Sequence, residues 1–472
     1  MRLTNHQIGL MPLLTFSQLR EGIDQRMDDP AITQGKTHCF YKIFQHALTY
    51  SLTESHQKLL KNRLHWPVFA QRAIYRLKSF NHSVSPSKMK SILLMDDGRI
   101  GTDENGTVKS YYFGPLLDEL GRDGISIARD HNHDSALPRE YELSDIELFR
   151  RTPIDPTEGK MLEDISFVLS KAKKSGKFND VEIDHISSAL HSFFEQYHMF
   201  YQWLKNSGVK HLLMTNHYHR EGIIAAAKDL GIISFEFQHG LIAAQDLYYV
   251  YDNKLAPFAD KAFFCDHLVV FGDYWKNVLL KGAGYAPEQL IVAGDYSIQR
   301  KAWKKHLSVE KENAIFIGAQ KNMPEHYIRY TKQLLSIIEE KHPEWEVWVK
   351  LHPYEKEPKM YNELLRSKYC KLYGNGDDLM ALLSKSKIQI SVYSTTFFDA
   401  LGLGVVNFSL QNYTTGSDYA KAMAEEGMAV PLLFDEDPVE KFELHQQENL
   451  LNREDVYGPI DLSKLKALLD LN

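Results

Sequence analysis

The feature that most constrains this chain is an alternation of short apolar runs with amphipathic segments, which occurs twice along the sequence. In the first half, residues 91–95, 211–214 and 232–237 have the length and composition of buried strands. Residues 221–230 suit a crossover helix, and Gly231 is a favoured residue just after a helix end. Strand, helix and strand at this spacing predict right-handed βαβ units and a parallel sheet.

The same pattern restarts after the polar stretch 299–313. Apolar runs at 314–320, 346–351 and 388–392 alternate with segments of helical periodicity. We therefore expect two Rossmann-like, doubly wound α/β domains. Open α/β sheets bind ligands beyond the carboxyl ends of their strands, so a cleft between two such domains is the expected binding site.

Chain length agrees with this division, because 472 residues exceed what one ordinary core accommodates. The expected segments are a helical N-terminal extension at 1–87, a first Rossmann-like domain at 88–298 with a helical insertion at 137–205, a linker at 299–313, and a second Rossmann-like domain at 314–472.

Composition excludes several classes of protein. A formal net charge of −7 argues against bulk nucleic-acid binding, so no nucleic-acid partner is expected. The three cysteines are far apart, which suits a reducing compartment and neither a disulfide framework nor a metal cluster. No signal peptide and no apolar run long enough to span a bilayer is recognised. We expect a cytoplasmic protein, with peripheral attachment to the inner face of the membrane as a further expectation.

A histidine follows a strand of the second half. Lys350 lies within the strand, and His352 and Pro353 come after it. Proline restricts the backbone and can hold the imidazole at the rim of the sheet, where it can donate to a phosphate oxygen. A loop histidine without a ligand fits the same pattern, so this interpretation stays open.

Other donor candidates surround that histidine. Hydroxyl groups of Ser394 and Thr395 lie between a strand and a helical pattern, and unpaired N–H groups at a helix start attract anions. A plain helix cap is the alternative. Gly318 and Gln320 end the first strand of this half, where a small residue allows a phosphate or ribose to approach. Asp399 is a candidate for a donor sugar or ribose hydroxyl.

In the first half, Gln238, His239 and Gly240 close a strand. Glycine permits a sharp turn that aims the imidazole at the cleft. Histidine titrates near pH 6.5 when unperturbed, so its neutral form is a suitable base for an acceptor hydroxyl. A structural histidine bonded to backbone is the alternative.

Weaker candidates follow two other strands of this half. Asp96 and Asp97 end the first strand, although a turn also selects aspartate. His217 and His219 alternate like zinc ligands, but no third ligand lies at a recognisable spacing. We expect these histidines to line the acceptor side or to cap the next helix, and we predict no metal site.

These motifs resemble those of known transferases. His352–Pro353 and Ser394–Thr395 resemble the His-Pro and Ser/Thr pairs that hold the donor nucleotide and phosphates in capsule and teichoic-acid transferases, including polysialyltransferases and CDP-glycerol glycerophosphotransferases. Residues 238–240 look like the Gln-His-Gly signature of surface-carbohydrate transferases, and are similar to the Trp-His-Gly segment of teichoic-acid polymerases. Residues 96–98 look like the acidic motif that supplies the base in bacterial sialyltransferases. The resemblance covers roughly residues 90–430.

The resemblance implies a GT-B glycosyltransferase of the bacterial capsule and surface-polysaccharide type. Its first domain binds an oligosaccharide or lipid-linked saccharide acceptor, and its second binds a nucleotide-activated sugar. The implied reaction is a metal-independent, inverting displacement with His239 or Asp97 as base. The donor is a substrate, and no cofactor is expected. Together with the candidates assigned from their position alone, the expected donor-side residues are Gly318, Gln320, Lys350, His352, Pro353, Ser394, Thr395 and Asp399. The expected acceptor-side residues are Asp96, His217, His219 and Gln238.

Three other functions stay open. A CDP-glycerol or ribitol phosphotransferase shares the histidine motifs, a nucleotide-sugar 2-epimerase shares the two-domain plan, and a non-catalytic scaffold is the third. A basic amphipathic segment at 58–90 suggests contact with an anionic membrane surface. Packing of its apolar face against the first domain is the alternative.

Overall fold

The structure, a computed structural model, describes residues 89–471 with gaps. The gaps are 97–98, 104, 130–140, 143–153, 177, 179, 219, 243–247, 250–262, 283, 299–304, 321–322, 353–354, 356–357, 375, 393, 412–416 and 446–450. The predicted N-terminal extension at 1–87 and nearly all of the basic segment at 58–90 lie outside the described residues, as do Asp97, His219 and Pro353.

The chain divides into two compact units between Ile298 and Gln299, and it returns to the first unit at Gly458. We call them the N-terminal and C-terminal units. The return differs from the predicted boundary, which kept all of 314–472 in one domain. Gly458 donates its backbone N–H to the Phe271 carbonyl at 3.0 Å and accepts from the Asp295 N–H at 3.0 Å. These bonds fix the last segment to the N-terminal unit.

A parallel seven-stranded sheet forms the centre of the N-terminal unit. Its strand order is β5-β4-β1-β6-β7-β8-β9. The strands are β1 (Ile92–Asp96), β4 (Ile125–Arg129), β5 (Tyr141–Glu142), β6 (His211–Met214), β7 (Ile233–Phe237), β8 (His267–Val270) and β9 (Leu290–Val292). Both β1 and β6 are buried along their whole length, which explains why they are apolar apart from Asp96 at the end of β1 and His211 at the start of β6.

Helices flank this sheet, and a short antiparallel pair of strands follows β1. The elements are β2 (Ile100–Thr102), β3 (Val108–Ser110), α7 (Phe113–Leu120), α8 (Pro156–Ser175), α9 (Asp180–Lys205), α10 (Glu221–Asp229), α11 (Asp273–Leu280), the 3-10 turn η6 (Pro287–Gln289) and α18 (Ser463–Leu468). The predicted crossover helix is α10. Gly231 has φ +71° just after it, as a helix-ending glycine should.

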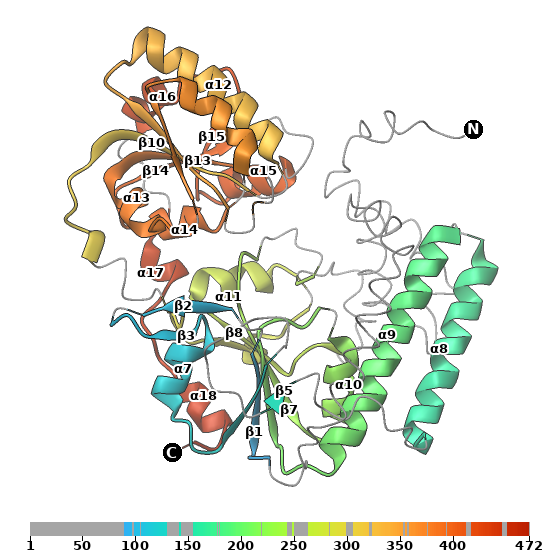
Figure 1. The fold of residues 1–472 in the computed structure, drawn as a ribbon. Helices are drawn as coiled ribbons and strands as arrows, with labels where there is room; N and C mark the ends of the chain where they lie inside the picture. The colour runs from blue at the N-terminus through green and yellow to red at the C-terminus, as the bar shows by residue number, and fades with distance from the viewer. Residues whose placement is uncertain are drawn as a thin grey trace. The chain divides into compact units, whose positions relative to one another are not determined.

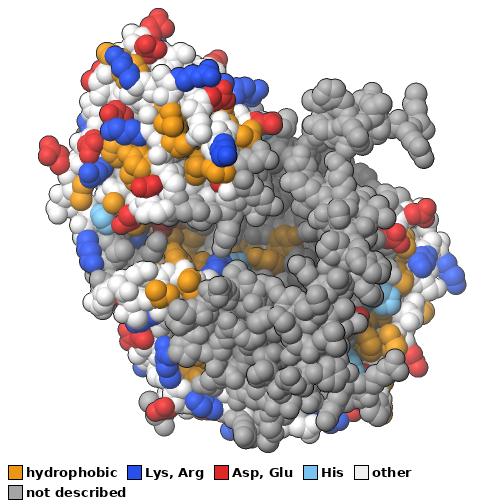
Figure 2. Space-filling view, viewed as in Figure 1, with side chains coloured by type: hydrophobic (Ala, Val, Ile, Leu, Met, Phe, Trp, Pro, Cys, Tyr) orange, Lys and Arg blue, Asp and Glu red, His pale blue; other side chains and the backbone are white. Residues whose placement is uncertain are grey.

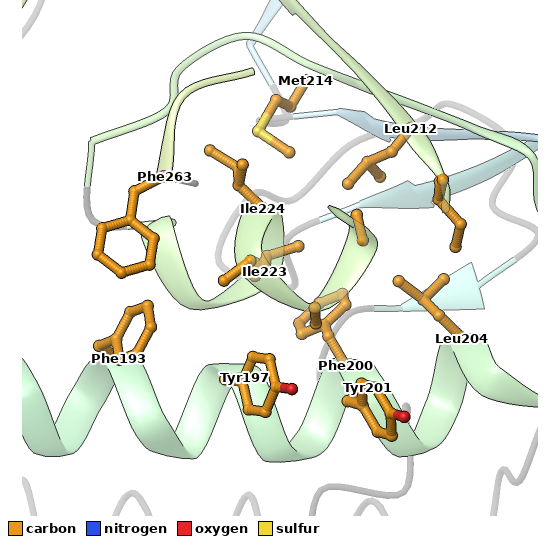
Figure 3. Close-up of a cluster of buried hydrophobic side chains, with 14 of the residues drawn as sticks. Phe193, Tyr197, Phe200, Tyr201, Leu204, Leu212, Met214, Ile223, Ile224 and Phe263 are labelled. Atoms are coloured by element: carbon orange, nitrogen blue, oxygen red, sulfur yellow. The ribbon is translucent and has the colours of Figure 1, made fainter. Parts of the chain in front are cut away.

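Within the predicted helical insertion at 137–205, the structure describes strand β5, which belongs to the central sheet, and then the two long helices α8 and α9. They lie side by side, with α10 between α9 and the sheet (Figure 1). Phe193, Tyr197 and Phe200 of α9 face the apolar side chains of α10 (Figure 3). Close packing depends on Gly222 of α10, because a Cβ there would lie 2.2 Å from the Phe193 carbonyl oxygen.

A second parallel sheet, of six strands, forms the C-terminal unit, with the order β12-β11-β10-β13-β14-β15. The strands are β10 (Glu312–Gly318), β11 (Glu346–Lys350), β12 (Cys370–Tyr373), β13 (Ser386–Ser391), β14 (Val406–Leu410) and β15 (Val430–Leu432). The helices are α12 (Pro324–Lys341), η8 (Pro358–Arg366, a 3-10 helix), α13 (Leu379–Lys385), α14 (Thr396–Ala400), α15 (Ser417–Glu425), α16 (Pro438–His445) and α17 (Arg453–Val456).

Alternate residues of the central strand β10 serve two separate cores. Ile315 and Ile317 pack with side chains of α12, α15 and α16 on one face. Ala314 and Phe316 pack with side chains of α13 and the end of α14 on the other. This alternation follows from the two-residue side-chain period of a strand, and it places helices on both faces of the sheet.

The predicted fold class, α/β with two Rossmann-like doubly wound domains, is confirmed. In each sheet the first strand, β1 or β10, has its sequence neighbour on one side and a later strand on the other, and this reversal is the topological switch point of Rossmann folds. Within the described residues, no helix is long and apolar enough to span a bilayer. On the face shown in Figure 2, acidic and basic side chains of the described residues are interspersed.

Candidate functional site

The described candidate residues lie at or beyond the carboxyl ends of strands near the two switch points. In the N-terminal unit they follow β1, β6 and β7. In the C-terminal unit they follow β10, β11 and β13. Ligands of open α/β sheets bind at this edge, so the topology brings each set to the place where a ligand is expected. The two sets are described separately below.

His239 follows β7 and is held at both its backbone and its ring. Tyr112 donates its hydroxyl to the His239 carbonyl oxygen. The Tyr218 hydroxyl lies 2.9 Å from Nε2 of the imidazole. Because Nδ1 is buried, Nε2 is the nitrogen that can reach a ligand. If His239 is the predicted base, the atom that accepts the proton is therefore Nε2, which Tyr218 contacts.

His217 lies in the interior, whereas the sequence analysis expected it to line the acceptor side or to cap the next helix. Its Nδ1 lies 2.5 Å from the Glu236 carboxylate, and its Nε2 lies 2.9 Å from the Tyr248 carbonyl oxygen. Tyr249 donates its hydroxyl to the same carboxylate at 2.8 Å. The side chains of His217 and Glu236 are both fully buried. We call this arrangement the buried pair.

The two side chains of the buried pair interact electrostatically. Burial alone would raise the pKa of Glu236, but the facing His217, together with the hydrogen bonds from His217 and Tyr249, holds it below its ordinary value. A carboxylate that accepts several hydrogen bonds in the interior is stabilised in its charged form. The buried pair therefore secures the segment of Tyr248 and Tyr249 beside the end of β6.

The other acceptor-side candidates have structural contacts. Gln238 is fully buried, donates to the Gly240 carbonyl at 2.9 Å, and accepts the Phe271 N–H at 3.1 Å. It therefore shapes the turn that carries His239. Asp96 is also buried and accepts a hydrogen bond from Ser110 at 3.1 Å.

In the C-terminal unit, the buried Tyr327 of α12 joins the loops after β10 and β13. Its hydroxyl donates to Gln320 at 2.9 Å, accepts the Val392 N–H at 3.1 Å, and lies 3.1 Å from the Ser391 hydroxyl. Ser391 in turn donates to the Gly318 carbonyl at 3.0 Å. Gly318, at the end of β10, and Gln320, just after it, thus belong to one hydrogen-bond network at the switch point.

Lys350 and His352 differ in their surroundings. Burial lowers the pKa of Lys350, and Asp377 offsets this effect only in part. The ammonium group of Lys350 donates to the Gly374 carbonyl at 2.7 Å, so this side chain is bound to the loop after β12. His352 is half-buried, and its carbonyl oxygen accepts the Glu355 N–H at 2.9 Å. Of the two side chains, that of His352 is the more exposed.

The hydroxyl cluster after β13 differs from the sequence prediction. Thr395 is exposed, and the hydroxyl that contacts Ser394 belongs to Thr396, at 2.9 Å. The helix that follows, α14, has only five residues, so it provides no sustained helix dipole for an anion. The predicted anion site at this helix start stays a prediction, and the structure favours the hydroxyl groups over the short helix as its polar groups.

Asp399 lies on α14, which buried side chains hold in place. One guanidinium nitrogen of Arg453 donates to the carbonyl oxygens of Phe398, Asp399 and Leu401, at 3.1–3.3 Å. Asn407 donates to the Phe397 carbonyl at 2.8 Å. These bonds fix the backbone of α14, and the side chain of Asp399 is half-buried.

Sequence reasoning missed several residues that contact the candidates directly or, for Gln389, through Thr396. They are Tyr112, Tyr218, Glu236, Tyr327, Gln389, Thr396 and Arg453. Glu236 and Gln389 carried a readable signal, since each is a polar residue inside a strand-like apolar run and must have a partner when buried.

No family model and no curated protein matches the chain. Similar solved structures include the UDP-GlcNAc 2-epimerase from Neisseria meningitidis bound to UDP-GlcNAc (16% identity, 81% of this chain and 100% of that chain, TM-score 0.45). They also include an alpha,alpha-trehalose-phosphate synthase (UDP-forming) from Burkholderia vietnamiensis (9%, 78% and 92%, TM-score 0.40). A third is WaaG, a glycosyltransferase involved in lipopolysaccharide biosynthesis (10%, 76% and 90%, TM-score 0.35). We transfer no residue role from these likenesses.

Proposed function

We propose that the protein is a glycosyltransferase that moves a sugar from a nucleotide-activated donor to a saccharide acceptor of a bacterial surface polysaccharide. The observation that carries the proposal is His239, whose Nε2 lies at the carboxyl edge of the N-terminal sheet in contact with Tyr218. Its buried Nδ1 leaves a single nitrogen to act on an acceptor hydroxyl.

The C-terminal unit supports the donor half of the proposal. His352 and Ser394 offer polar groups beyond β11 and β13, and Gly318 leaves the end of β10 without a side chain. Such groups can hydrogen-bond the phosphates of a nucleotide sugar and stabilise the charge that develops on the leaving nucleotide. The motifs of the two units also resemble those of capsule and teichoic-acid transferases.

In the proposed mechanism, His239 Nε2 takes the proton of the acceptor hydroxyl as its oxygen attacks the anomeric carbon. The bond between that carbon and the phosphate oxygen breaks, and the nucleotide leaves with the electron pair. His352 and Ser394 stabilise its new charge. Attack from the face opposite the leaving group inverts the anomeric carbon, and the reaction takes no electrons from a cofactor.

A thermal-shift screen with CMP, CDP, UDP, GDP and TDP tests donor binding, because a ligand that binds only the folded state raises Tm by mass action. The matching nucleotide sugar is then incubated with and without saccharide acceptors. Acceptor-dependent release of nucleotide supports the proposal. Isomerisation of the sugar without acceptor would show an epimerase, transfer of a polyol phosphate would show a phosphotransferase, and no nucleotide binding would indicate a scaffold.

Substitution His352→Ala should weaken nucleotide binding and leave the fold intact. Loss of a hydrogen bond to a charged phosphate should cost about 1.5–3 kcal/mol of binding free energy. Titration calorimetry measures this change, and Tm monitors folding. His191→Ala, at an exposed position of α9, is the matched control and should bind like wild type. An unaltered nucleotide affinity in folded His352→Ala would remove this residue from the donor site.

A further inference from the structure

The hydroxyl of Ser394 has both of its acceptor positions in use. Thr396 donates to Ser394 Oγ twice, from its hydroxyl at 2.9 Å and from its backbone N–H at 3.3 Å. A serine hydroxyl has two acceptor lone pairs and a single proton. The proton of Ser394 is therefore directed away from Thr396, and the half-buried side chain makes it accessible to a ligand.

A buried residue of the sheet determines which hydroxyl donates and which accepts in these hydrogen bonds. Gln389, a fully buried residue of β13, donates its side-chain amide to the Thr396 hydroxyl oxygen. Because Thr396 accepts from the amide, its own proton is available for Ser394. Gln389, Thr396 and Ser394 form a chain of hydrogen bonds that runs from the sheet interior to the carboxyl edge. Hydrogen bonds in such a chain polarise one another, so Ser394 becomes a better donor.

The position of Thr396 places this chain at the switch point. A Cβ added to Gly318, the last residue of β10, would lie 3.5 Å from the Thr396 hydroxyl. The hydroxyls therefore lie beside the end of β10, where open α/β sheets bind their ligands. An oriented donor at this edge suits an acceptor-only group, and a phosphate oxygen is such a group.

We infer that Thr396, held by Gln389, is the positioning residue that orients the Ser394 hydroxyl as a hydrogen-bond donor to a phosphate of the nucleotide. The inference rests on the proposed function, because it takes the nucleotide donor as the ligand. It departs from the sequence resemblance, in which Thr395 is the partner of Ser394. Thr396 does not touch the ligand itself and acts through Ser394.

The test uses the full chain with four substitutions. Ser394→Ala removes the donor, Thr396→Val removes the orienting hydroxyl at nearly constant volume, and Thr396→Ser restores that hydroxyl. Thr102→Val, at an exposed position of β2, is the control. The probes are CMP, CDP, UDP, GDP and TDP, together with the nucleosides of those that bind, and affinity is measured by titration calorimetry alongside Tm.

Ser394→Ala should weaken nucleotide binding by about 10- to 100-fold, because it loses a direct hydrogen bond to a charged phosphate. Thr396→Val should weaken it by about 3- to 10-fold, because it loses only the hydrogen bond that orients Ser394. Thr396→Ser should recover most of the affinity, and Thr102→Val should match wild type. Affinity for the nucleosides should not change in any variant, because they carry no phosphate. A merely structural role of Thr396 would weaken nucleoside and nucleotide binding alike.

The outcomes separate the inference from the proposed function. If Ser394→Ala weakens binding and folded Thr396→Val does not, the positioning role of Thr396 is wrong and the donor site stands. If Ser394→Ala binds like wild type, the inference and the donor role of Ser394 are wrong, and the proposed function is judged by its own test of nucleotide binding and release. If wild type binds none of the five nucleotides, both are wrong. If Thr396→Val does not fold, the inference is judged by Thr396→Ser, and failure of this folded variant to bind within about threefold of wild type would overturn it.

Discussion

His239→Ala should lower kcat by about 10²–10⁴-fold, the range expected when a general base is removed. The physical reason is that Nε2 is the base of the proposed mechanism, since the other ring nitrogen, Nδ1, is buried. Nucleotide affinity should be unchanged, because the proposed donor residues lie in the other unit. Steady-state kinetics with saturating donor and acceptor, together with calorimetry for the nucleotide, separates these two effects.

Two further variants make this prediction specific. Tyr218→Phe keeps the ring and removes the hydroxyl at 2.9 Å from Nε2, so it should lower kcat by about tenfold and alter the pH profile through loss of one hydrogen bond. Asp97→Asn tests the alternative base from the sequence, at a position outside the described residues. Near-normal turnover in His239→Ala with a large loss in Asp97→Asn would transfer the role of base to Asp97.

His217→Leu should destabilise the protein by about 3–5 kcal/mol at pH 7, because it leaves the Glu236 carboxylate buried without its partner. The free energy of unfolding is measured by chemical denaturation at constant pH. The double substitution His217→Leu with Glu236→Leu removes both partners together, and such replacements are often close to neutral. It should be more stable than His217→Leu alone. Equal stability of the two variants would contradict a coupled pair.

The lowered pKa of Glu236 predicts how the stability effect of His217→Leu changes with pH. Because the folded-state pKa lies below the ordinary value of about 4.3, the carboxylate adds stability above that value, and this stability is lost as the pH falls through the lower folded-state value. In His217→Leu, His217 no longer opposes the effect of burial on the pKa of Glu236, so the protonated form of this carboxyl group is favoured. The stability difference between wild type and His217→Leu should therefore narrow as the pH falls from 7 to 4.

The sequence by itself determined the two doubly wound halves and the ends of several elements. Strands such as β1 and β6 are covered on both faces, so their burial appears directly as apolar runs. Gly231 could be assigned to a helix end because its left-handed backbone is a local property. Polar residues after these runs could be assigned to the carboxyl edge, since a parallel sheet puts all strand ends of one kind together.

Only the tertiary structure decided what those polar residues contact. His217 and Glu236 are 19 residues apart, and Tyr327 and Ser391 are 64 apart, so their hydrogen bonds depend on strand register and helix packing. The choice of Thr396 over Thr395 also depends on which side chain turns toward Gln389. The return of the chain at Gly458 follows from backbone bonds to Phe271 and Asp295. Local periodicity encodes secondary structure, whereas these contacts arise between segments that the sequence does not place side by side.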